Sequence, residues 1–354
     1  MSEHSSPQSS SQLNGKRKQE HLDIALNQDI EFREMRSELD DYQFIHQALP
    51  EIDLFDIDLS TPLFGKKLGS PLLISPMVGG IATARRINRN LAAAAQTLGL
   101  AMGVGSLRCA IDDPTTAASY QVRDVAPDIL LMANLGAVQL NYGYGVNECR
   151  RAVEMIGADA LVLHLNPLQE ALQPEGNTNF AGLLDKIGEV CQEMPVPIIV
   201  KEVGWGISET VARQLASAGV AAIDVAGAGG TSWSEVEKQR THTEMGDGVA
   251  AVFESWGIPT AESIKMVRCG APGLTLIASG GIRSGVDVAK AIALGAHLAG
   301  IATPLLRAAN ISAESVIVAL QKIIQELRLA MFCLGVANLR DLTGSPLLVK
   351  KSRG

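Results

Sequence analysis

The sequence has few aromatic residues and no excess of basic ones. Its 354 residues include 7 Phe, 3 Trp and 4 Tyr, and 30 Lys and Arg against 38 Asp and Glu give a formal net charge of −8. A chain of this kind lacks the positive field and the stacking surfaces of a general nucleic-acid-binding protein. We therefore expect no nucleic-acid partner, and any anionic ligand has to be bound by a local cluster of donors.

Cysteines are also few, and they follow no pattern. They are Cys109, Cys149, Cys191, Cys269 and Cys333. An odd number of cysteines without a Cys-x-x-Cys pair argues against a disulfide framework and against a structural zinc site. We therefore expect these residues to pack as small buried hydrophobic side chains.

Long apolar segments are absent too. No run reaches the roughly 18 apolar residues that a membrane-spanning helix requires. Residues 1–12 are polar and serine-rich, without the apolar segment of a secretory signal, and their composition is typical of a disordered tail. These absences predict a soluble, cytoplasmic protein without a membrane partner.

What the chain does have is a regular alternation of short apolar runs and helical patterns. It follows a charged, helix-like segment from Lys16 to about Met35 and an irregular lead-in to about residue 62. The runs lie at residues 71–75, 98–104, 128–135, 159–165, 196–202, 220–225, 273–278 and 296–301. Helical patterns between them include residues 83–97, 179–193, 208–218 and 284–294.

Continuously apolar runs are typical of parallel strands buried on both faces. Eight of them with crossover helices predict an α/β fold, a single (β/α)8 TIM barrel over residues 13–354 with an N-terminal arm at about 13–62. An open doubly wound sheet is the alternative, but no Gly-x-Gly-x-x-Gly follows the first run. Residues 231–255 predict a long functional loop, and residues 312–344 a helical extension.

Polar residues recur where the apolar runs end, which is where barrels carry their active sites. Gly280 and Gly281 follow the seventh run shortly before a helix, an arrangement that suits a phosphate, unless the glycines only form tight turns. Lys201 ends the fifth run. It is a candidate Schiff-base nucleophile or a cation beside an electron-rich ring, or else a salt-bridge partner of Glu202.

Two further motifs carry polar side chains. The stretch HLNPLQE at residues 164–170 places an imidazole, two amides and a carboxylate at one strand end, a set whose oxygens suit a hard cation such as Mg²⁺. The RKQEH segment at residues 17–21 is either a solvated charge run or an arm that folds over the barrel mouth toward a phosphate.

Together these motifs resemble the type 2, FMN-dependent isopentenyl-diphosphate δ-isomerases, from about Arg17 to about residue 345. HLNPLQE and the RKxEH arm are specific, whereas SGGIR (279–283) is shared by many FMN barrels. The other motifs are SPMVGG (75–80), GSLR (105–108), ANLG (133–136), VKEVGWG (200–206) and DVAGAGGTSW (224–233). The resemblance implies interconversion of isopentenyl and dimethylallyl diphosphate with reduced FMN, NAD(P)H as reductant and Mg²⁺, in a homo-oligomer, a tetramer or octamer.

The resemblance also implies roles for individual residues, with reduced FMN itself exchanging protons at its N5 edge. Candidates for orienting substrate or relaying protons are His164, Gln169 and Glu235. Expected substrate contacts are Arg17, Lys18, Ser106, Leu107, Arg108 and Gln169, and Glu170 is the expected Mg²⁺ ligand. Expected flavin contacts are Ser75, Pro76, Met77, Val78, Ser106, Asn134, Lys201, Thr231, Gly280, Gly281, Arg283, Ala302 and Thr303. The family usually has a hydroxyl residue where Val78 stands and often another where Pro76 stands, so the flavin contact of the missing Val78 hydroxyl has to come from a backbone amide instead.

Three other functions agree less well with these residues. An FMN oxidoreductase such as an α-hydroxyacid oxidase shares the SGGIR-type segment, but residues 241–244 (THTE) do not supply its His-Gly-x-Arg-Gln-type segment. A purine-nucleotide dehydrogenase needs a cysteine after the sixth strand, and none lies between Cys191 and Cys269. A catalytically silent flavin-binding barrel has no need of Gln169, Glu170 or the basic arm.

Overall fold

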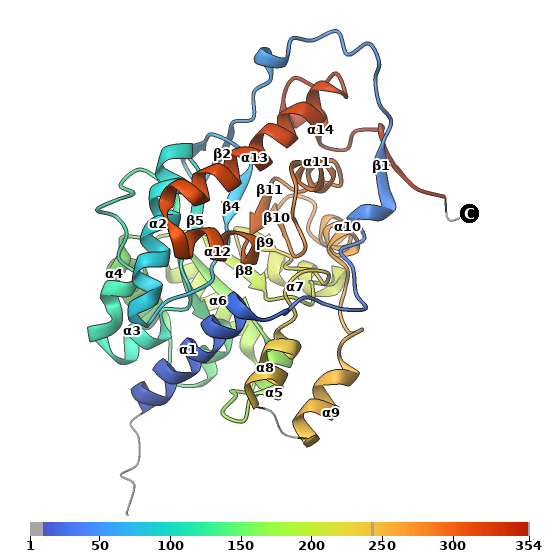
Figure 1. Cartoon of the computed structure of the whole chain (residues 1–354). Helices are drawn as coiled ribbons and strands as arrows, with labels where there is room; N and C mark the ends of the chain where they lie inside the picture. Colours follow the sequence, from blue (N-terminus) through green and yellow to red (C-terminus); the bar gives the residue numbers. More distant parts are fainter. Residues whose placement is uncertain (1–9, 242–243, 353–354) are drawn as a thin grey trace, which may run out of the picture.

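The computed structural model describes residues 10–241 and 244–352. Eight parallel strands form a closed barrel in the order β4 to β11, and β11 pairs with β4 to close it (Figure 1). The strands are β4 (Leu72–Ile74), β5 (Ala101–Gly103), β6 (Leu131–Gly136), β7 (Ala160–Leu165), β8 (Ile198–Glu202), β9 (Ala222–Asp224), β10 (Thr275–Ser279) and β11 (Leu298–Ile301). Each overlaps one of the predicted apolar runs, so the barrel is confirmed and the open sheet is excluded.

Helices surround the barrel. They are α2 (Ala82–Leu98), α3 (Arg108–Asp112), α4 (Val146–Ile156), α5 (Pro167–Leu172), α6 (Leu183–Glu193), α7 (Glu209–Ser217), α10 (Thr260–Gly270), α11 (Gly285–Ala293), α12 (Thr303–Ile311), α13 (Ala313–Phe332) and α14 (Leu339–Leu342). Two antiparallel pairs lie outside the barrel: β1 (Tyr42–Phe44) with β12 (Leu348–Lys350), and β2 (Thr61–Leu63) with β3 (Lys66–Leu68). The predicted C-terminal helical extension is α13 and α14, and α13 packs against α2 and α11.

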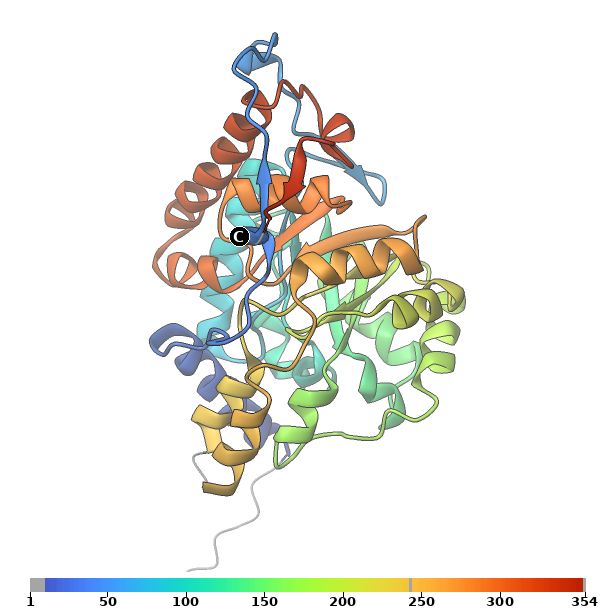
Figure 2. The same ribbon diagram turned by 90° about the vertical axis from the view of Figure 1, so that its right-hand side faces the viewer.

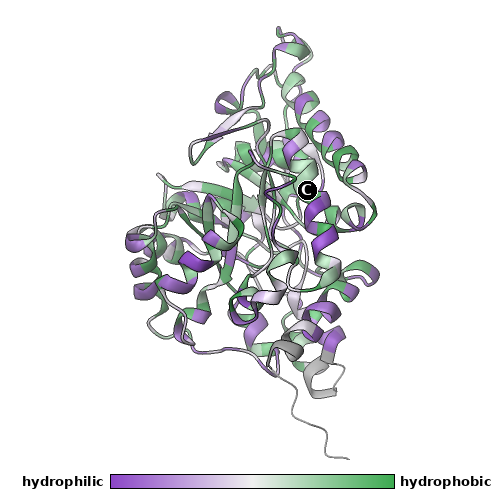
Figure 3. Ribbon diagram, turned by 90° about the vertical axis from the view of Figure 1, so that its left-hand side faces the viewer, coloured by the Kyte–Doolittle hydropathy of each residue, from purple (hydrophilic) through white to green (hydrophobic). Residues whose placement is uncertain are grey.

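Apolar side chains form one layer inside the barrel and another between strands and helices. Leu73, Met132 and Ile277 belong to the inner layer. Helix α2 buries Ile87 and Leu91, which are four residues apart and therefore share a face, in the outer layer. Figure 3 shows the same division: the strands are hydrophobic, and the helices carry hydrophilic residues on their outer faces.

The N-terminal arm and the insertion differ from expectation. Residues 1–9 of the expected tail lie outside the described residues, and α1 (Ser10–Asn27) begins within the expected tail and ends well before Met35. The expected loop at 231–255 instead contains α8 (Trp233–Thr241) and α9 (Glu244–Val252). Figure 2 shows α1, α8 and α9 gathered at one end of the barrel, with the β2–β3 pair toward the other.

The cysteines and the membrane expectation can also be compared with the structure. All five cysteines are free; Cys109 and Cys149 are buried as expected, whereas Cys269 on α10 is exposed and that expectation was wrong. None of the helices in the described part of the chain combines the length and apolar content needed to cross a lipid bilayer.

Candidate active site

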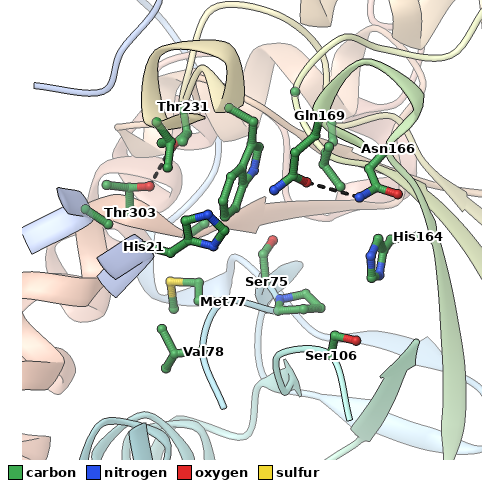
Figure 4. A pocket seen from close by; sticks show the side chains of 18 of the residues that line it. His21, Ser75, Met77, Val78, Ser106, His164, Asn166, Gln169, Thr231 and Thr303 are labelled. Atoms are coloured by element: carbon green, nitrogen blue, oxygen red, sulfur yellow. Dashed lines mark hydrogen bonds between the residues drawn. The ribbon is translucent and has the colours of Figure 1, made fainter. Parts of the chain in front are cut away.

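A pocket lies at the carboxyl ends of the barrel strands, and the arm and α8 also contribute to its lining (Figure 4). Nearly all the residues that the sequence predicts for the site line this pocket. They are Arg17, Lys18, Ser75, Pro76, Met77, Val78, Ser106, Arg108, Asn134, His164, Gln169, Glu170, Lys201, Thr231, Gly280, Gly281, Arg283, Ala302 and Thr303. The fold therefore brings the arm and the predicted strand ends together around one cavity.

Two selected residues do not line this pocket. Leu107 is fully buried in the apolar core, and its backbone N–H donates to the Asn134 carbonyl oxygen at 2.8 Å. Glu235 is buried in α8, where its carboxylate lies 3.3 Å from Lys238 Nζ and 3.5 Å from an Arg33 nitrogen. Leu107 thus packs in the apolar core, and Glu235 joins α8 to neighbouring cations, so neither side chain faces the pocket in this structure.

One end of the pocket consists of close-packed glycine backbone. Gly280 and Gly281 have φ angles of 101° and 70°, in the left-handed region that favours glycine. A Cβ atom on Gly230 would lie 2.4 Å from the backbone nitrogen of Gly281, so the two loops can approach only without side chains. Across this end, the hydroxyls of Thr231 and Thr303 are 2.6 Å apart, and α12 begins at Thr303 (Figure 4). A helix start beside such a turn suits a phosphate group.

Lys201 forms its ion pair with Asp224, not with Glu202. Its Nζ lies 3.6 Å from Asp224 Oδ2 and donates a hydrogen bond to the Glu202 carbonyl oxygen at 2.8 Å. The Glu202 carboxylate instead accepts the backbone N–H groups of residues 203–205 at 2.5–2.7 Å. Burial raises the pKa of Glu202 to about 7, against the lowering effect of these N–H groups. The salt-bridge alternative with Glu202 was therefore wrong.

His164 is held as a neutral hydrogen-bonding group. Its Nδ1 lies 2.9 Å from Asn134 Oδ1, which accepts the ring proton and leaves Nε2 as an acceptor. Burial, together with the charges of Lys201 and Lys18, lowers the pKa of His164 to about 4.

This environment predicts that His164 does not titrate near neutral pH. Because its pKa is lowered, the ring takes up a proton only well below the usual value of about 6.5, so it stays neutral between about pH 5 and 8. Nuclear magnetic resonance of the imidazole nitrogens should show no transition in this range. A transition centred near pH 6.5 would contradict the assignment.

The amide and carboxylate side chains of HLNPLQE form a linked set, and Figure 4 shows the hydrogen bond between Asn166 and Gln169 within it. Asn166 Nδ2 donates to Gln169 Oε1 at 3.1 Å and to Glu170 Oε1 at 3.0 Å, while Glu170 Oε2 accepts the Asn177 N–H at 2.6 Å. Asn166 Oδ1 is buried and has no hydrogen-bond partner. No group of three or more His, Cys, Asp or Glu side chains gathers at a metal-binding distance within residues 10–241 and 244–352. One carboxylate with an unpaired amide oxygen fits Mg²⁺, which takes one or two protein carboxylates and completes its shell with water and phosphate.

Glu237 is buried on α8 and contacts two residues that line the pocket, although no sequence motif indicated it. Its Oε1 accepts Gln169 Nε2 at 3.2 Å and lies 3.0 Å from His21 Nε2, and its Oε2 accepts Arg240 Nε at 2.8 Å. Burial opposes its charge, but the contacts with His21 and Arg240 outweigh this and lower the pKa of Glu237. The His21 ring also packs edge-on against Trp233 at a centroid distance of 5.3 Å. Glu237 thus joins the arm, α8 and the HLNPLQE segment.

Lys18 is hydrogen-bonded to Tyr120, a residue that lies outside all the sequence motifs. Its Nζ donates to the Ser106 carbonyl oxygen at 2.9 Å and to the Tyr120 hydroxyl at 2.6 Å, and Tyr120 in turn donates to Ser106 O at 2.7 Å. Burial lowers the pKa of Lys18, although Cys109 raises it. Tyr120 is fully buried, and a Cβ atom on Gly79 would lie 1.9 Å from its ring, so the ring packs directly on the SPMVGG backbone.

The chain matches the model of a known family and a set of curated relatives. The family is described as FMN-dependent dehydrogenase and is matched by residues 11–125 and 170–349. A Nostoc protein named isopentenyl-diphosphate delta-isomerase is 54% identical over 93% of this chain and 94% of its own. A Synechococcus protein of the same name is 55% identical over 90% and 91%, and one from Stutzerimonas stutzeri is 51% identical over 94% and 96%.

Solved structures share the fold at low identity. A flavocytochrome b2 variant with pyruvate bound gives a TM-score of 0.68 at 17% identity, covering 94% of this chain and 84% of its own. A mandelate oxidase variant with 2-hydroxy-phenylacetamide gives 0.63 at 19% identity, covering 96% of each chain. At these identities the likeness concerns the barrel alone.

Proposed function

Because the chain belongs to the isopentenyl-diphosphate delta-isomerases within the FMN-dependent dehydrogenase family, we propose that it interconverts isopentenyl and dimethylallyl diphosphate with reduced FMN and Mg²⁺. The observation that carries this proposal is the composition of one pocket. It combines a glycine-rich phosphate cradle, a linked amide–carboxylate set and a basic arm. An oxidoreductase acting on a hydroxy acid has no use for a second phosphate-binding region opposite the first.

We assign the flavin phosphate to the cradle of Gly280, Gly281 and the start of α12, with the ring near Met77, Asn134 and Lys201. The fit rests on the backbone of Gly280 and Gly281, which carries no side chain beside the start of α12, and on the buried Ser75 hydroxyl, which has no hydrogen-bond partner. Val78 has an apolar side chain, and its carbonyl oxygen already accepts the N–H of Gly105. Bound in reduced form, FMN supplies an electron-rich ring that stabilises positive charge on the substrate. NAD(P)H is the proposed source of its electrons.

The substrate diphosphate is assigned to the arm side of the pocket. Arg17 and Arg108 line the pocket and are held by Gln173 Oε1 at 3.1 Å and Asn177 Oδ1 at 3.0 Å. Their guanidinium groups and the Lys18 ammonium give the pocket a local positive charge that the acidic chain as a whole lacks. Glu170 is the proposed Mg²⁺ ligand beside this diphosphate, with substrate oxygens and water completing the shell.

The reaction adds a proton to the terminal alkene carbon and removes another from the carbon next to the one that bears the diphosphate. The transition state resembles a tertiary carbocation, so neutral and anionic neighbours favour it. Neutral His164 satisfies this requirement. Gln169, fixed on one side by Asn166 and on the other by Glu237, is the proposed group that orients the reacting carbons. Water is excluded by the arm and α8.

We also propose a homo-oligomer, a tetramer or octamer. Apolar side chains exposed along the C-terminal helices support it: Ile311 is 73% exposed and Val318 66%. Such side chains on adjacent helices suit a contact between copies of the chain.

An anaerobic assay tests the proposed function. Purified protein receives FMN, Mg²⁺ and isopentenyl diphosphate, with and without a reductant of the flavin. We expect dimethylallyl diphosphate only when the flavin is reduced. A yellow protein that makes no product but oxidises hydroxy acids would move the assignment to an FMN oxidoreductase.

The hydrogen bonds that hold Lys18 give a further prediction. Replacing Tyr120 by phenylalanine keeps the buried ring but removes one acceptor of the Lys18 ammonium. We expect the KM for the diphosphate substrate to rise about tenfold with a smaller change in kcat, the loss expected for one hydrogen bond to a charged group. Steady-state kinetics measure this, and faster tryptic cleavage after Lys18 should accompany it. An unchanged KM in a folded Tyr120→Phe protein would show that the Tyr120 hydroxyl does not position the lysine.

A further inference from the structure

Polar side chains form a row across five neighbouring strands at the pocket floor. Asn134 on β6 accepts from His164 on β7, and His164 is in register with Lys201 on β8. Lys201 is in turn in register with Asp224 on β9, and Asp224 Oδ1 accepts the Ser279 hydroxyl of β10 at 2.6 Å. Four of these five side chains line the pocket, whereas Asp224 lies beneath them and is 1% exposed.

Two members of this row carry formal charges. Lys201 is 9% exposed, and its Nζ lies 3.6 Å from Asp224 Oδ2. Asp224 Oδ2 has no hydrogen-bond partner, so its interaction with Lys201 is purely that of an ion pair. The other carboxylate nearby, Glu202, turns to the backbone N–H groups of residues 203–205. Asp224 is therefore the anion that balances the Lys201 charge at the floor.

We propose that Asp224 is a positioning residue that holds Lys201 and partly cancels its charge, and thereby sets how strongly the pocket favours the reduced flavin over the oxidised one. This inference rests on the proposed function, since it assumes that the flavin ring lies against Lys201. A reduced flavin carries more negative charge than an oxidised one, so an uncompensated cation beside it stabilises the reduced form. The buried anion limits that effect, because its negative charge lies 3.6 Å from the Lys201 ammonium.

Replacing Asp224 by asparagine tests this inference in the protein loaded with FMN. Asparagine retains the acceptor for Ser279 and removes the charge. We expect the ratio of reduced to oxidised flavin, at a fixed redox-dye potential, to rise about tenfold relative to the wild type.

Further variants decide between explanations. In a Lys201→Met background, Asp224→Asn should change the ratio by less than about twofold, because the proposed effect passes through the lysine. Asp224→Glu, which keeps the charge, should give a ratio of reduced to oxidised flavin close to that of the wild type. If Asp224→Asn does not retain FMN, Asp224→Ser should give the same directions of change.

The outcomes separate this inference from the proposed function. If the wild type binds no FMN, the proposed function fails. If it binds FMN and Lys201→Met lowers the reduced fraction, but Asp224→Asn gives the same ratio of reduced to oxidised flavin as the wild type, the inference on Asp224 is overturned. An equal effect of Asp224→Asn with and without Lys201 also overturns it, since Asp224 would then act on the flavin directly.

Discussion

Replacing Glu237 by glutamine should lower kcat/KM by about two orders of magnitude, whereas the same change at Glu235 should cost less than about threefold. The two carboxylates lie two residues apart on α8, about 200° around the helix, and therefore point to opposite sides. Glu237 contacts Gln169 and His21 at the pocket, while Glu235 pairs with Arg33 and Lys238 away from it.

The size of the effect follows from what Glu237 holds. Its Oε1 fixes the Gln169 amide, so that the amide oxygen faces Asn166, and it also binds His21 of the arm. Glutamine has one acceptor oxygen where glutamate has two. If that oxygen keeps the bond with Gln169, the amide NH2 group faces Arg240 Nε, which donates to Oε2 in the wild type. Both the amide orientation and the arm are therefore disturbed, and displacements of this kind cost catalysis heavily.

Steady-state kinetics on the two variants, with visible spectra to verify FMN binding, provide the measurement. Glu235→Gln is the matched control, since it removes a buried carboxylate from the same helix and also breaks ion pairs. Equal losses in both variants would mean that α8 needs its charges only to fold, and that Glu237 has no particular relation to the reaction.

The strand ends could be predicted from the sequence because each depends on a local pattern. A continuous apolar run followed by a polar residue predicts a buried strand that ends at the site, and this is why Lys201, His164 and Asn134 were found. Glu237 lies in a helix with charges on every side, where no apolar stripe predicts which face is buried. The sequence feature that could have indicated Glu237 is its spacing from Arg240. The two residues are three positions apart, which places them on the same face of a helix, and they form an ion pair.

Side-chain contacts between segments that are distant in the chain could not be predicted from the sequence. Tyr120 is 102 residues from Lys18 and follows a short turn outside every motif. Asp224 is the first residue of the DVAGAGGTSW motif and forms the ion pair with Lys201. The packing of α1 on the barrel joins Lys18 to Tyr120, and the pairing of β8 with β9 joins Lys201 to Asp224. An apolar pattern predicts the strands but not the side chains that meet across them.

Replacing Glu170 by glutamine should abolish Mg²⁺-dependent turnover, by about three orders of magnitude, while the protein stays yellow. Glu170 is 7% exposed, and each of its oxygens already accepts one hydrogen bond, from Asn166 and from the Asn177 N–H. A carboxylate oxygen has a further lone pair for a metal, and the amide that replaces it lacks the charge that a hard cation requires.

The control for this change is Glu175→Gln. Glu175 is a nearby, more exposed carboxylate that pairs with Arg240 at 2.8 Å and does not line the pocket. Turnover and its Mg²⁺ dependence should be nearly unchanged in this variant, because an ion pair whose carboxylate is exposed contributes little and Arg240 keeps its pair with Glu237. If Glu170→Gln retained wild-type activity and Mg²⁺ response, the metal assignment would be wrong, and the Asn166–Gln169–Glu170 set would have to act only by shaping the loop. If activity were lost together with the yellow colour, Glu170 would instead support the flavin side of the pocket, since a metal held by substrate phosphate and one carboxylate has no reason to control FMN retention.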